Sequence, residues 1–400
     1  MSAADGGGQR RRAEDRPVLV TLVGDEPLVP LVLARQLAAR RVICVGPTVV
    51  EWRVEPLLGI LRREGRAADW ISLDATDVPT ACAELEARPR LGHDGAVVFD
   101  LTNARGVLGF ALYELAVARE RRQPDDCRLL RVDWSDRLVR SISPDRATTE
   151  PLRAQVSLTD YLGVHGKHLV GVERGPGSRS AFGDAARRIA GSMQHAHLLL
   201  QATHRGQPDR PLQMHNRHAA ARLVDGLIAD GVLERLGRAL YASSPKAFQF
   251  LHGRWLEEYL FEIADASGEF DDCASGVRFS WSDDGDGSGN VDVTNEIDFA
   301  GTAGGRATIA SCKTGGRDVN GPLYELLTLA ERAAGRSVVT VFATIDTLDR
   351  AARRRAAALG IRILDGSRLS DPAQVLQALL KGTPAPGTTT ATRPSPSAVR

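Results

Sequence analysis

The feature that most constrains the fold of this chain is an alternation of short apolar segments with longer segments of helical periodicity. Strands are predicted at 17–24, 41–46, 70–76, 95–103 and 127–134, with a hairpin partner at 138–143, and helices over 27–39, 49–64, 79–88 and 105–121. Strands that alternate with helices form a parallel sheet covered on both faces. Such a sheet binds ligands at the carboxyl ends of its strands.

Candidate contacts with a phosphorylated ligand lie in the loops after the first and fourth strands. A glycine there lets the backbone approach a ligand, while hydroxyl, amide and guanidinium groups donate hydrogen bonds near a helix start. Neither loop contains the glycine-rich motif of a dinucleotide-binding fold or a P-loop NTPase. A turn glycine followed by helix-capping side chains is an equally good interpretation. The predicted binding residues are Thr21, Gly24, Asp25, Thr102, Asn103 and Arg105.

Residues 17–165 resemble the CRISPR-associated Rossmann-fold (CARF) domain, which senses cyclic oligoadenylates. The resemblance rests on the strand order, on the two loops and on 156–162 (VSLTDYL), which is similar to the family's closing helix. The family's second loop typically reads Thr-Gly-Gly-Thr-Lys. Here Thr102 matches, the glycine pair does not, and Arg105 would supply the cation one position early. The resemblance implies a cyclic oligoadenylate activator, above all cyclic tetra-adenylate, and leaves its ring size open.

The middle of the chain, 171–250, begins with a Gly/Pro/Ser-rich stretch typical of a linker. A helix near 183–203, a second helix within 217–234 and a hairpin turning at Gly237 follow, and a helix before a short hairpin is the winged-helix pattern. Nucleic-acid backbone contacts would come from Arg217, Arg222, Arg235 and Arg238. A small connecting domain is the favoured alternative, because no aromatic or Asn/Gln cluster marks a base-reading helix.

The sharpest chemical pattern lies in 251–370, in three ordered blocks: GRWLEEYL (253–260), NEID (295–298) and SCKTG (311–315). The first block opens a predicted helix that carries Glu257. The other two lie on predicted strands joined by a Gly-rich turn. Because side chains two apart on a strand share one face, Glu296 lies beside Asp298 and Ser311 beside Lys313.

Carboxylates beside an ammonium group suit the hydrolysis of a phosphodiester. A hard cation such as Mg²⁺ or Mn²⁺ prefers carboxylate and carbonyl oxygen, neutralises developing charge and lowers the pKa of attacking water. A lysine orients the water or stabilises the transition state. The acidic stretch 251–300, with 2 Arg against 13 Asp and Glu, suits a cation site. The predicted catalytic residues are Glu257, Glu296, Asp298, Ser311 and Lys313, and the predicted metal ligands are Glu257, Asp298 and Cys312.

These blocks resemble the PD-(D/E)xK restriction-endonuclease-like fold and, over 250–365, the nuclease domain that follows CARF in CRISPR accessory nucleases. Many relatives carry an acid where this chain has Ser311, so either Glu296 would supply that charge or the activity would be low. The resemblance implies a type III CRISPR antiviral nuclease that cleaves DNA, RNA or both. A symmetric activator further implies a C2 homodimer joined through the sensor domains. The alternatives are a transcription regulator with an inactive nuclease fold and a nucleotide-binding enzyme without a nucleic-acid partner.

Composition sets the remaining expectations. A chain of 400 residues is longer than one hydrophobic core usually organises, so two or three domains are expected. A content of 43% hydrophobic and 25% charged residues is ordinary for a soluble protein. Without a signal peptide, a spanning segment or a CxxC pair, the chain is expected in the cytoplasm with no membrane partner. Residues 382–400 are expected to be a disordered tail. The predicted fold is α/β, with an N-terminal Rossmann-like parallel sheet, a winged-helix-like connector and a C-terminal restriction-endonuclease-like domain.

Overall fold

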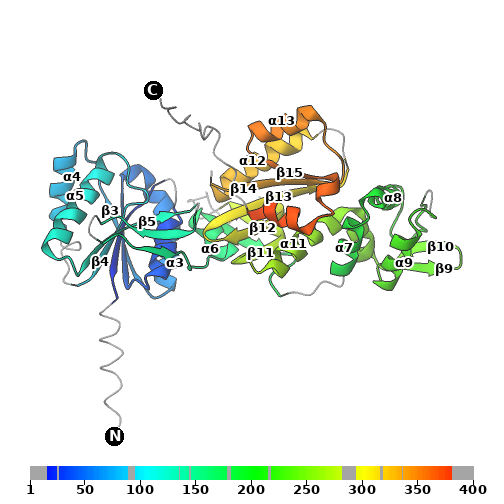
Figure 1. The fold of residues 1–400 in the computed structure, drawn as a ribbon, viewed down its shortest axis with the longest axis horizontal. Helices are drawn as coiled ribbons and strands as arrows, with labels where there is room; N and C mark the ends of the chain where they lie inside the picture. The colour runs from blue at the N-terminus through cyan, green and yellow to red at the C-terminus, as the bar shows by residue number, and fades with distance from the viewer. Residues whose placement is uncertain are drawn as a thin grey trace, which may run out of the picture.

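Two β-sheets and a smaller, mainly helical region follow one another along an elongated molecule (Figure 1). The computed structural model describes residues 16–24, 27–88, 95–134, 136–143, 146–177, 182–214, 218–281, 294–315, 319–335 and 337–380. Asp25, Arg217, the acidic loop after Trp281 and the predicted tail 382–400 lie outside these residues.

The first sheet has seven strands in the order β3-β2-β1-β4-β5-β6-β7. Five of them are parallel: β1 (Val18–Leu22), β2 (Arg41–Gly46), β3 (Ala67–Ser72), β4 (Val97–Asp100) and β5 (Cys127–Asp133). The antiparallel hairpin of β5 with β6 (Leu138–Ser141) and the short β7 (Thr149–Pro151) close one edge. This architecture confirms the predicted parallel sheet, although β3 begins earlier than predicted because 67–69 already pair with β2.

Helices cover both faces of this sheet because its strands are apolar on both sides. On one face, Leu19 and Val42 pack with α2 (Val29–Gln36) and α3 (Glu51–Arg63). On the other, Val20 and Ile43 pack towards α4 (Val78–Glu86) and α5 (Gly106–Arg122). The carboxyl ends of β1, β2 and β4 therefore point towards one edge, where their loops meet.

The second sheet has six strands in the order β15-β14-β13-β12-β11-β8. β13 (Arg306–Lys313), β14 (Val339–Thr344) and β15 (Arg362–Asp365) are parallel. β12 (Thr294–Ala303), β11 (Asp272–Trp281) and β8 (Lys167–Gly171) continue it in antiparallel fashion. The second sheet is therefore mixed. β8 was not predicted, because it immediately follows α6 (Leu158–Val164), the predicted closing helix of the first part.

Alternate strand residues of the second sheet face two helical layers. Ile309 and Phe342 belong to the same apolar cluster as α12 (Asn320–Ala334) and α13 (Arg350–Ala358). Ala310 and Val341 belong to the cluster of α11 (Trp255–Ser267) and α14 (Pro372–Leu380). The sheet is thus sandwiched between α12 and α13 on one side and α11 and α14 on the other (Figure 1).

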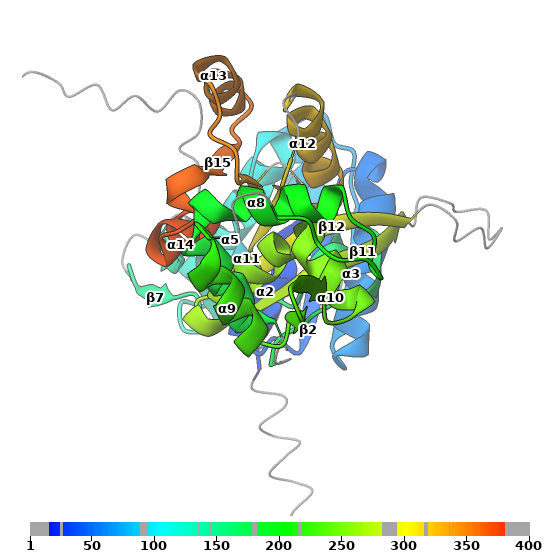
Figure 2. The same ribbon diagram turned by 90° about the vertical axis from the view of Figure 1, so that its right-hand side faces the viewer.

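The middle region lies at the end of the molecule and packs onto the second sheet (Figure 2). One helix was predicted over 183–203, but two are present, α7 (Gly183–Ala190) and α8 (Met193–His204), separated by Gly191 and Ser192. After them come α9 (Ala221–Ala229), the hairpin of β9 (Leu233–Leu236) and β10 (Ala239–Ala242), and α10 (Pro245–Gln249). Buried residues of these helices share one apolar cluster with α11 and the second sheet, so this region is continuous with the core beside it.

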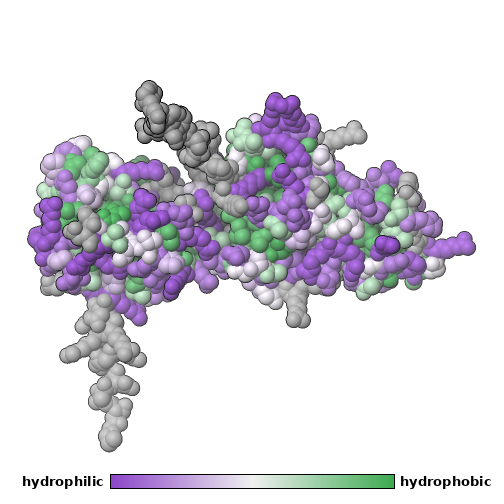
Figure 3. Space-filling view, in the orientation of Figure 1, coloured by the Kyte–Doolittle hydropathy of each residue, from purple (hydrophilic) through white to green (hydrophobic). Residues whose placement is uncertain are grey.

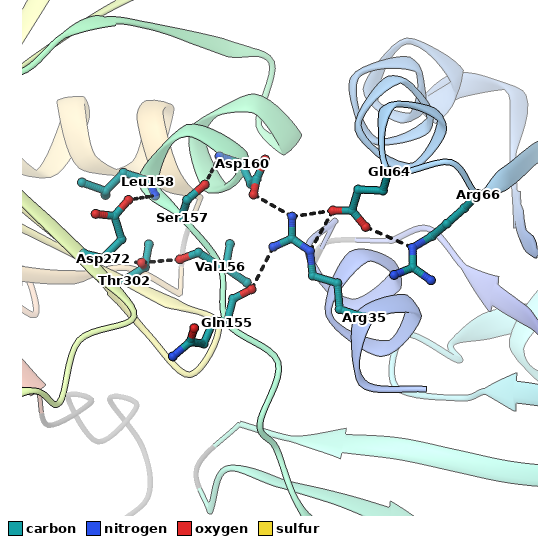
Figure 4. A network of polar contacts seen from close by, with 10 residues as sticks. All are labelled: Arg35, Glu64, Arg66, Gln155, Val156, Ser157, Leu158, Asp160, Asp272 and Thr302. Carbon is teal, nitrogen blue, oxygen red and sulfur yellow. Dashed lines mark hydrogen bonds and ion pairs between the residues drawn. The ribbon is translucent and has the colours of Figure 1, made fainter. Parts of the chain in front are cut away.

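A chain of polar contacts joins the two sheets (Figure 4). On α2, the Arg35 guanidinium contacts Glu64 and the Gln155 carbonyl oxygen, and it lies 2.6 Å from Asp160 of α6. The Leu158 N–H donates to Asp272 of β11 at 2.8 Å, and the Thr302 hydroxyl of β12 donates to the Val156 carbonyl. The segment between β7 and α6 is therefore bonded to both sheets. None of the helices described combines enough length with enough apolar character to span a bilayer.

Candidate active site and ligand pocket

The three predicted blocks meet at one end of the second sheet. A π-helical turn, Phe250–Arg254, leads into α11 and brings Glu257 towards the end of β13. Gly253 makes this approach possible, because a Cβ there would lie 2.8 Å from Thr314 Oγ1. The neighbouring Glu258 instead pairs with Arg174, so of the two adjacent acids only Glu257 lines the pocket described below.

Asp298 lies where the pairing of β12 with β13 stops. The last paired residues of that ladder are Phe299 and Ala310. Just beyond them, Asp298 Oδ2 accepts the Cys312 backbone N–H at 2.6 Å and the Ser311 hydroxyl at 3.2 Å. Lys313 Nζ lies 4.0 Å from the same oxygen. The carboxylate thus replaces a backbone acceptor at the end of the ladder, which fixes its orientation beside the lysine.

Electrostatics at this site centre on Glu257. Burial raises the pKa of its carboxyl to about 8, and the negative charge of Asp298 adds to the increase. The charges of Glu173 and Glu296 act in the same direction, while Arg254 opposes them. Two carboxylates are thus close enough to repel each other in a partly buried place, and a cation between them would relieve that repulsion.

Of the predicted catalytic residues, Glu257 and Lys313 line a pocket of about 530 Å³, together with Cys312. Ser311 contacts Asp298 from β13, and Glu296 is exposed on β12 opposite Arg278. Within the described part of the chain, no group of three or more His, Cys, Asp or Glu side chains is placed to hold a metal ion. The carboxylates that suit a cation are therefore two, Glu257 and Asp298.

Cys312 was predicted as a metal ligand. Its side chain is buried, and burial raises the pKa of the thiol well above its usual value, with the charges of Asp298 and Glu257 adding to this effect. The thiol is therefore protonated at neutral pH and is a poor ligand for a hard cation. What the backbone of Cys312 does contribute is the N–H that holds Asp298.

A second, larger pocket of about 1030 Å³ lies at the carboxyl edge of the first sheet. Gly24, Asn103 and Arg105 line it, and the Asn103 side-chain amide donates to the Leu22 carbonyl at 3.2 Å. A Cβ on Gly24 would lie 3.3 Å from the Asn103 Cβ. The loops after β1 and β4 therefore lie side by side at this edge.

Thr21 and Thr102, also predicted to bind the ligand, face inward. The Thr21 hydroxyl donates to Asp100 Oδ2 at 2.6 Å, and both the hydroxyl and the backbone N–H of Thr102 donate to Asp100 Oδ1. Asp100 is fully buried, and burial raises the pKa of its carboxyl although these hydrogen bonds oppose the rise. In the structure the two threonines solvate a buried acid, and neither of them lines the pocket.

The far wall of the large pocket comes from the second half of the chain. His165 and Lys167, around the start of β8, and Arg332 and Gly335, at the end of α12, face the loops of the first sheet. Lys167 Nζ and the Arg332 guanidinium lie 4.6 and 4.5 Å from the ring centroid of Trp281 on β11. Sequence patterns did not indicate this wall, because its residues lie far from the two loops along the chain.

No family model matches this sequence, and no curated protein matches it significantly. The fold, however, matches solved structures over nearly its full length. The protein VC1899 from Vibrio cholerae superimposes with a TM-score of 0.74 at 17% identity, over 92% of this chain and 100% of that one. Can2 from Sulfobacillus thermosulfidooxidans, solved in complex with cyclic tetra-adenylate, superimposes with a TM-score of 0.67 at 18% identity, over 93% of this chain and 98% of that one.

A type III CRISPR defence DNA nuclease activated by cyclic oligoadenylate is a looser match, with a TM-score of 0.48 at 16% identity over 82% of this chain and 45% of that one. The class defined by fold and site is an α/β protein with a mostly parallel N-terminal sheet, a mixed C-terminal sheet and a pocket on each. More particularly, the chain has the fold of Can2.

Proposed function

We propose that this protein is a metal-dependent nuclease activated by a cyclic oligoadenylate, acting in type III CRISPR defence. The observation that carries the proposal is that Glu257 and Lys313 line one pocket, with Asp298 beside them, its Oδ2 4.0 Å from Lys313 Nζ. The complex of Can2 with cyclic tetra-adenylate supports the nature of the activator, since the two chains share a fold. The large pocket between the two sheets offers backbone at Gly24, an amide and several cationic groups to such a ligand.

The chemistry follows from how the site residues are held. Asp298 is fixed by the backbone N–H of Cys312, so it does not swing away when the pocket fills. Lys313 lies beside it and donates a hydrogen bond to the attacking water or to a phosphate oxygen, where negative charge grows in the transition state. Glu257 lines the same pocket from the first turn of α11.

The two carboxylates fit a divalent cation, because burial and the nearby charge of Asp298 both disfavour the ionised form of Glu257 and raise its pKa. When bound by Glu257, Asp298 and the Cys312 carbonyl, Mg²⁺ or Mn²⁺ would neutralise charge on the scissile phosphate and acidify the attacking water. Glu296 and Ser311, both predicted to be catalytic, would assist from the exposed side of β12 and through the hydrogen bond to Asp298.

The test is cleavage of plasmid and of single-stranded DNA and RNA with Mn²⁺, with and without cyclic tetra-adenylate. Wild-type protein should cleave only with the activator. Lys313→Ala should lower the rate by about 10²–10³, the usual effect of removing an electrostatic donor from a transition state. Asp298→Asn should have an effect of similar size.

Lys246→Ala is the matched control, since Lys246 is exposed on α10 and does not line the pocket. Calorimetric binding of cyclic tetra-adenylate should be the same in all variants, which separates a lost site from a lost fold. Wild-type cleavage by both Lys313→Ala and Asp298→Asn would contradict the assignment. An activator-binding protein that cleaves none of these substrates would instead favour a ligand-responsive regulator.

A further inference from the structure

Three aromatic rings form a row at the catalytic pocket, and the proposed chemistry uses none of them. His252 lies in the middle, its ring centroid 4.4 Å from that of His204 and 6.0 Å from that of Phe248. The interplanar angles are 21° and 18°, so the rings are nearly parallel. All three line the pocket together with Glu257 and Lys313.

The row is anchored at one end and open at the other. Phe248 is only 9% exposed and belongs to the apolar cluster of the second sheet. His252 is held by the π-helical turn before α11, whereas His204 is the last residue of α8, a helix packed into the same cluster. Both histidines are exposed. The outer ring therefore presents an aromatic face to anything that enters the pocket.

The chemistry of the pair suits stacking better than charge recognition or metal binding. Partial burial, together with the charge of His252, lowers the pKa of His204, which favours the neutral ring at neutral pH. Among the residues that the structure describes, no third His, Cys, Asp or Glu completes a metal-binding group with them. What remains is a flat, π-rich surface beside groups suited to phosphodiester chemistry.

We infer that the His204–His252 pair is a stacking platform for an unpaired nucleobase of the strand that enters the catalytic pocket. Bases stack on aromatic side chains in single-stranded nucleic acid, with little dependence on sequence because every base has a π face. The inference rests on the proposed nuclease function and deepens it. It also gives the middle region a role in substrate binding, because α8 supplies His204.

The experiment measures binding rather than cleavage. Fluorescein-labelled oligothymidylate and oligouridylate are titrated with protein by anisotropy, in EDTA and saturating cyclic tetra-adenylate. Stacking on one side chain is worth about 1–3 kcal/mol, so His204→Ala should weaken binding by roughly 5- to 150-fold. His204→Phe should retain wild-type affinity, because it keeps the ring. His195→Ala, on the same helix but outside the pocket lining, should bind like wild type.

Two results would overturn the stacking inference but leave the proposed nuclease function standing, and a third would overturn both. If the wild-type protein cleaves, but His204→Ala and His252→Ala both bind the strand as tightly as wild type, the pair is not a stacking platform. Affinity restored by His204→Arg but not by His204→Phe would indicate a phosphate contact instead of stacking. Wild-type protein that neither binds nor cleaves any strand would contradict the proposed nuclease itself. The DNA and RNA arms show which strand the platform accepts, and equal melting temperatures exclude misfolding as the cause of weaker binding.

Discussion

At the scale of single residues, Glu257 shows what happens when two acids share a partly buried pocket. The pKa of its carboxyl is raised to about 8 by burial and by Asp298, from an ordinary value near 4.5. Between these two pH values the folded protein binds a proton that the unfolded chain has released. Stability contributed by that proton is fully present below about pH 4.5 and is lost as the pH rises through about 8.

We therefore expect the metal-free protein to lose stability between these pH values through this residue. Glu257→Gln cannot ionise, so its melting temperature should exceed that of wild type at pH 8.5 and approach it at pH 5. Mn²⁺ should bind wild type more tightly as the pH rises, because the cation displaces the proton. Calorimetric melting and Mn²⁺ titration across this range measure both effects. A melting-temperature difference that does not change with pH would contradict the raised pKa.

Some of these residues were predictable from the sequence and others were not. Asp298 and Lys313 follow from strand periodicity and from the family-like blocks that carry them. Thr21 and Thr102 were assigned to a ligand, because a hydroxyl at the end of a strand is equally suited to a ligand and to a buried acid. Only the packing shows that Asp100 takes both hydroxyls. His204 had no sequence signal, since it meets His252 only when α8 packs beside the π-helical turn.

At the scale of elements, α5 carries an unusual surface. Phe110 is 65% exposed and Tyr113 is 45% exposed, although α5 covers the first sheet with its opposite side. Apolar surface is visible over α4 and α5 in Figure 3. Exposed aromatic groups gathered on one helix are typical of a protein interface. We propose that α5 forms part of the interface of the expected homodimer.

Sedimentation of Phe110→Glu tests this interface. Each copy would lose about 1.5–3 kcal/mol of apolar burial and place a charge at the contact, so the variant should sediment as a monomer where wild type is a dimer. Leu236→Glu is the matched control, since Leu236 is 62% exposed on the distant β9. A wild-type monomer with and without activator, or a Phe110→Glu dimer, would remove α5 from the interface.

Elements were predicted well where the local pattern sufficed. The strands β1 to β6 and helices α2 to α5 around the first sheet, and β12, β13 and α11 of the second, came from periodicity and from glycine positions. The division of α7 from α8 did not, because helical periodicity continues across Gly191 and Ser192. Nor did β8, which is short and finds its partner, β11, more than a hundred residues later.

At the scale of the whole molecule, the two pockets must communicate if the activator is to control cleavage. Activation requires that the ligand favour one relative placement of the sheets. The polar chain from Arg35 through Gln155 and Asp160 to Asp272 and Thr302 is a physical link between them (Figure 4). It ends on β11 and β12, and β12 carries Asp298.

Two arginine variants should separate binding from coupling. Arg105→Ala should weaken cyclic tetra-adenylate binding about tenfold to 150-fold, the value of one charge-assisted contact, and still cleave fully at saturating activator. Arg35→Ala should bind activator normally but cleave less at saturation. Arg146→Ala is the control, because its contacts with Pro124 and Asp125 are local. Calorimetry and cleavage rates measure both quantities. Full activation of Arg35→Ala would exclude the polar chain as the link between the sheets. Unchanged affinity of Arg105→Ala for cyclic tetra-adenylate would exclude a phosphate contact by Arg105.

Because the far wall of the large pocket comes from the second half of the chain, the first sheet cannot be separated from that half without losing part of the pocket. His165, Lys167, Arg332 and Gly335 face the loops of the first sheet from β8 and α12. A graft of the first sheet onto a different effector would carry the loops but leave one wall of the cavity behind. Any such chimaera would have to recreate the wall formed by β8 and α12. Recognition of a ligand in this pocket would therefore require both parts of the chain, and the first sheet could not be transferred as an independent binding domain.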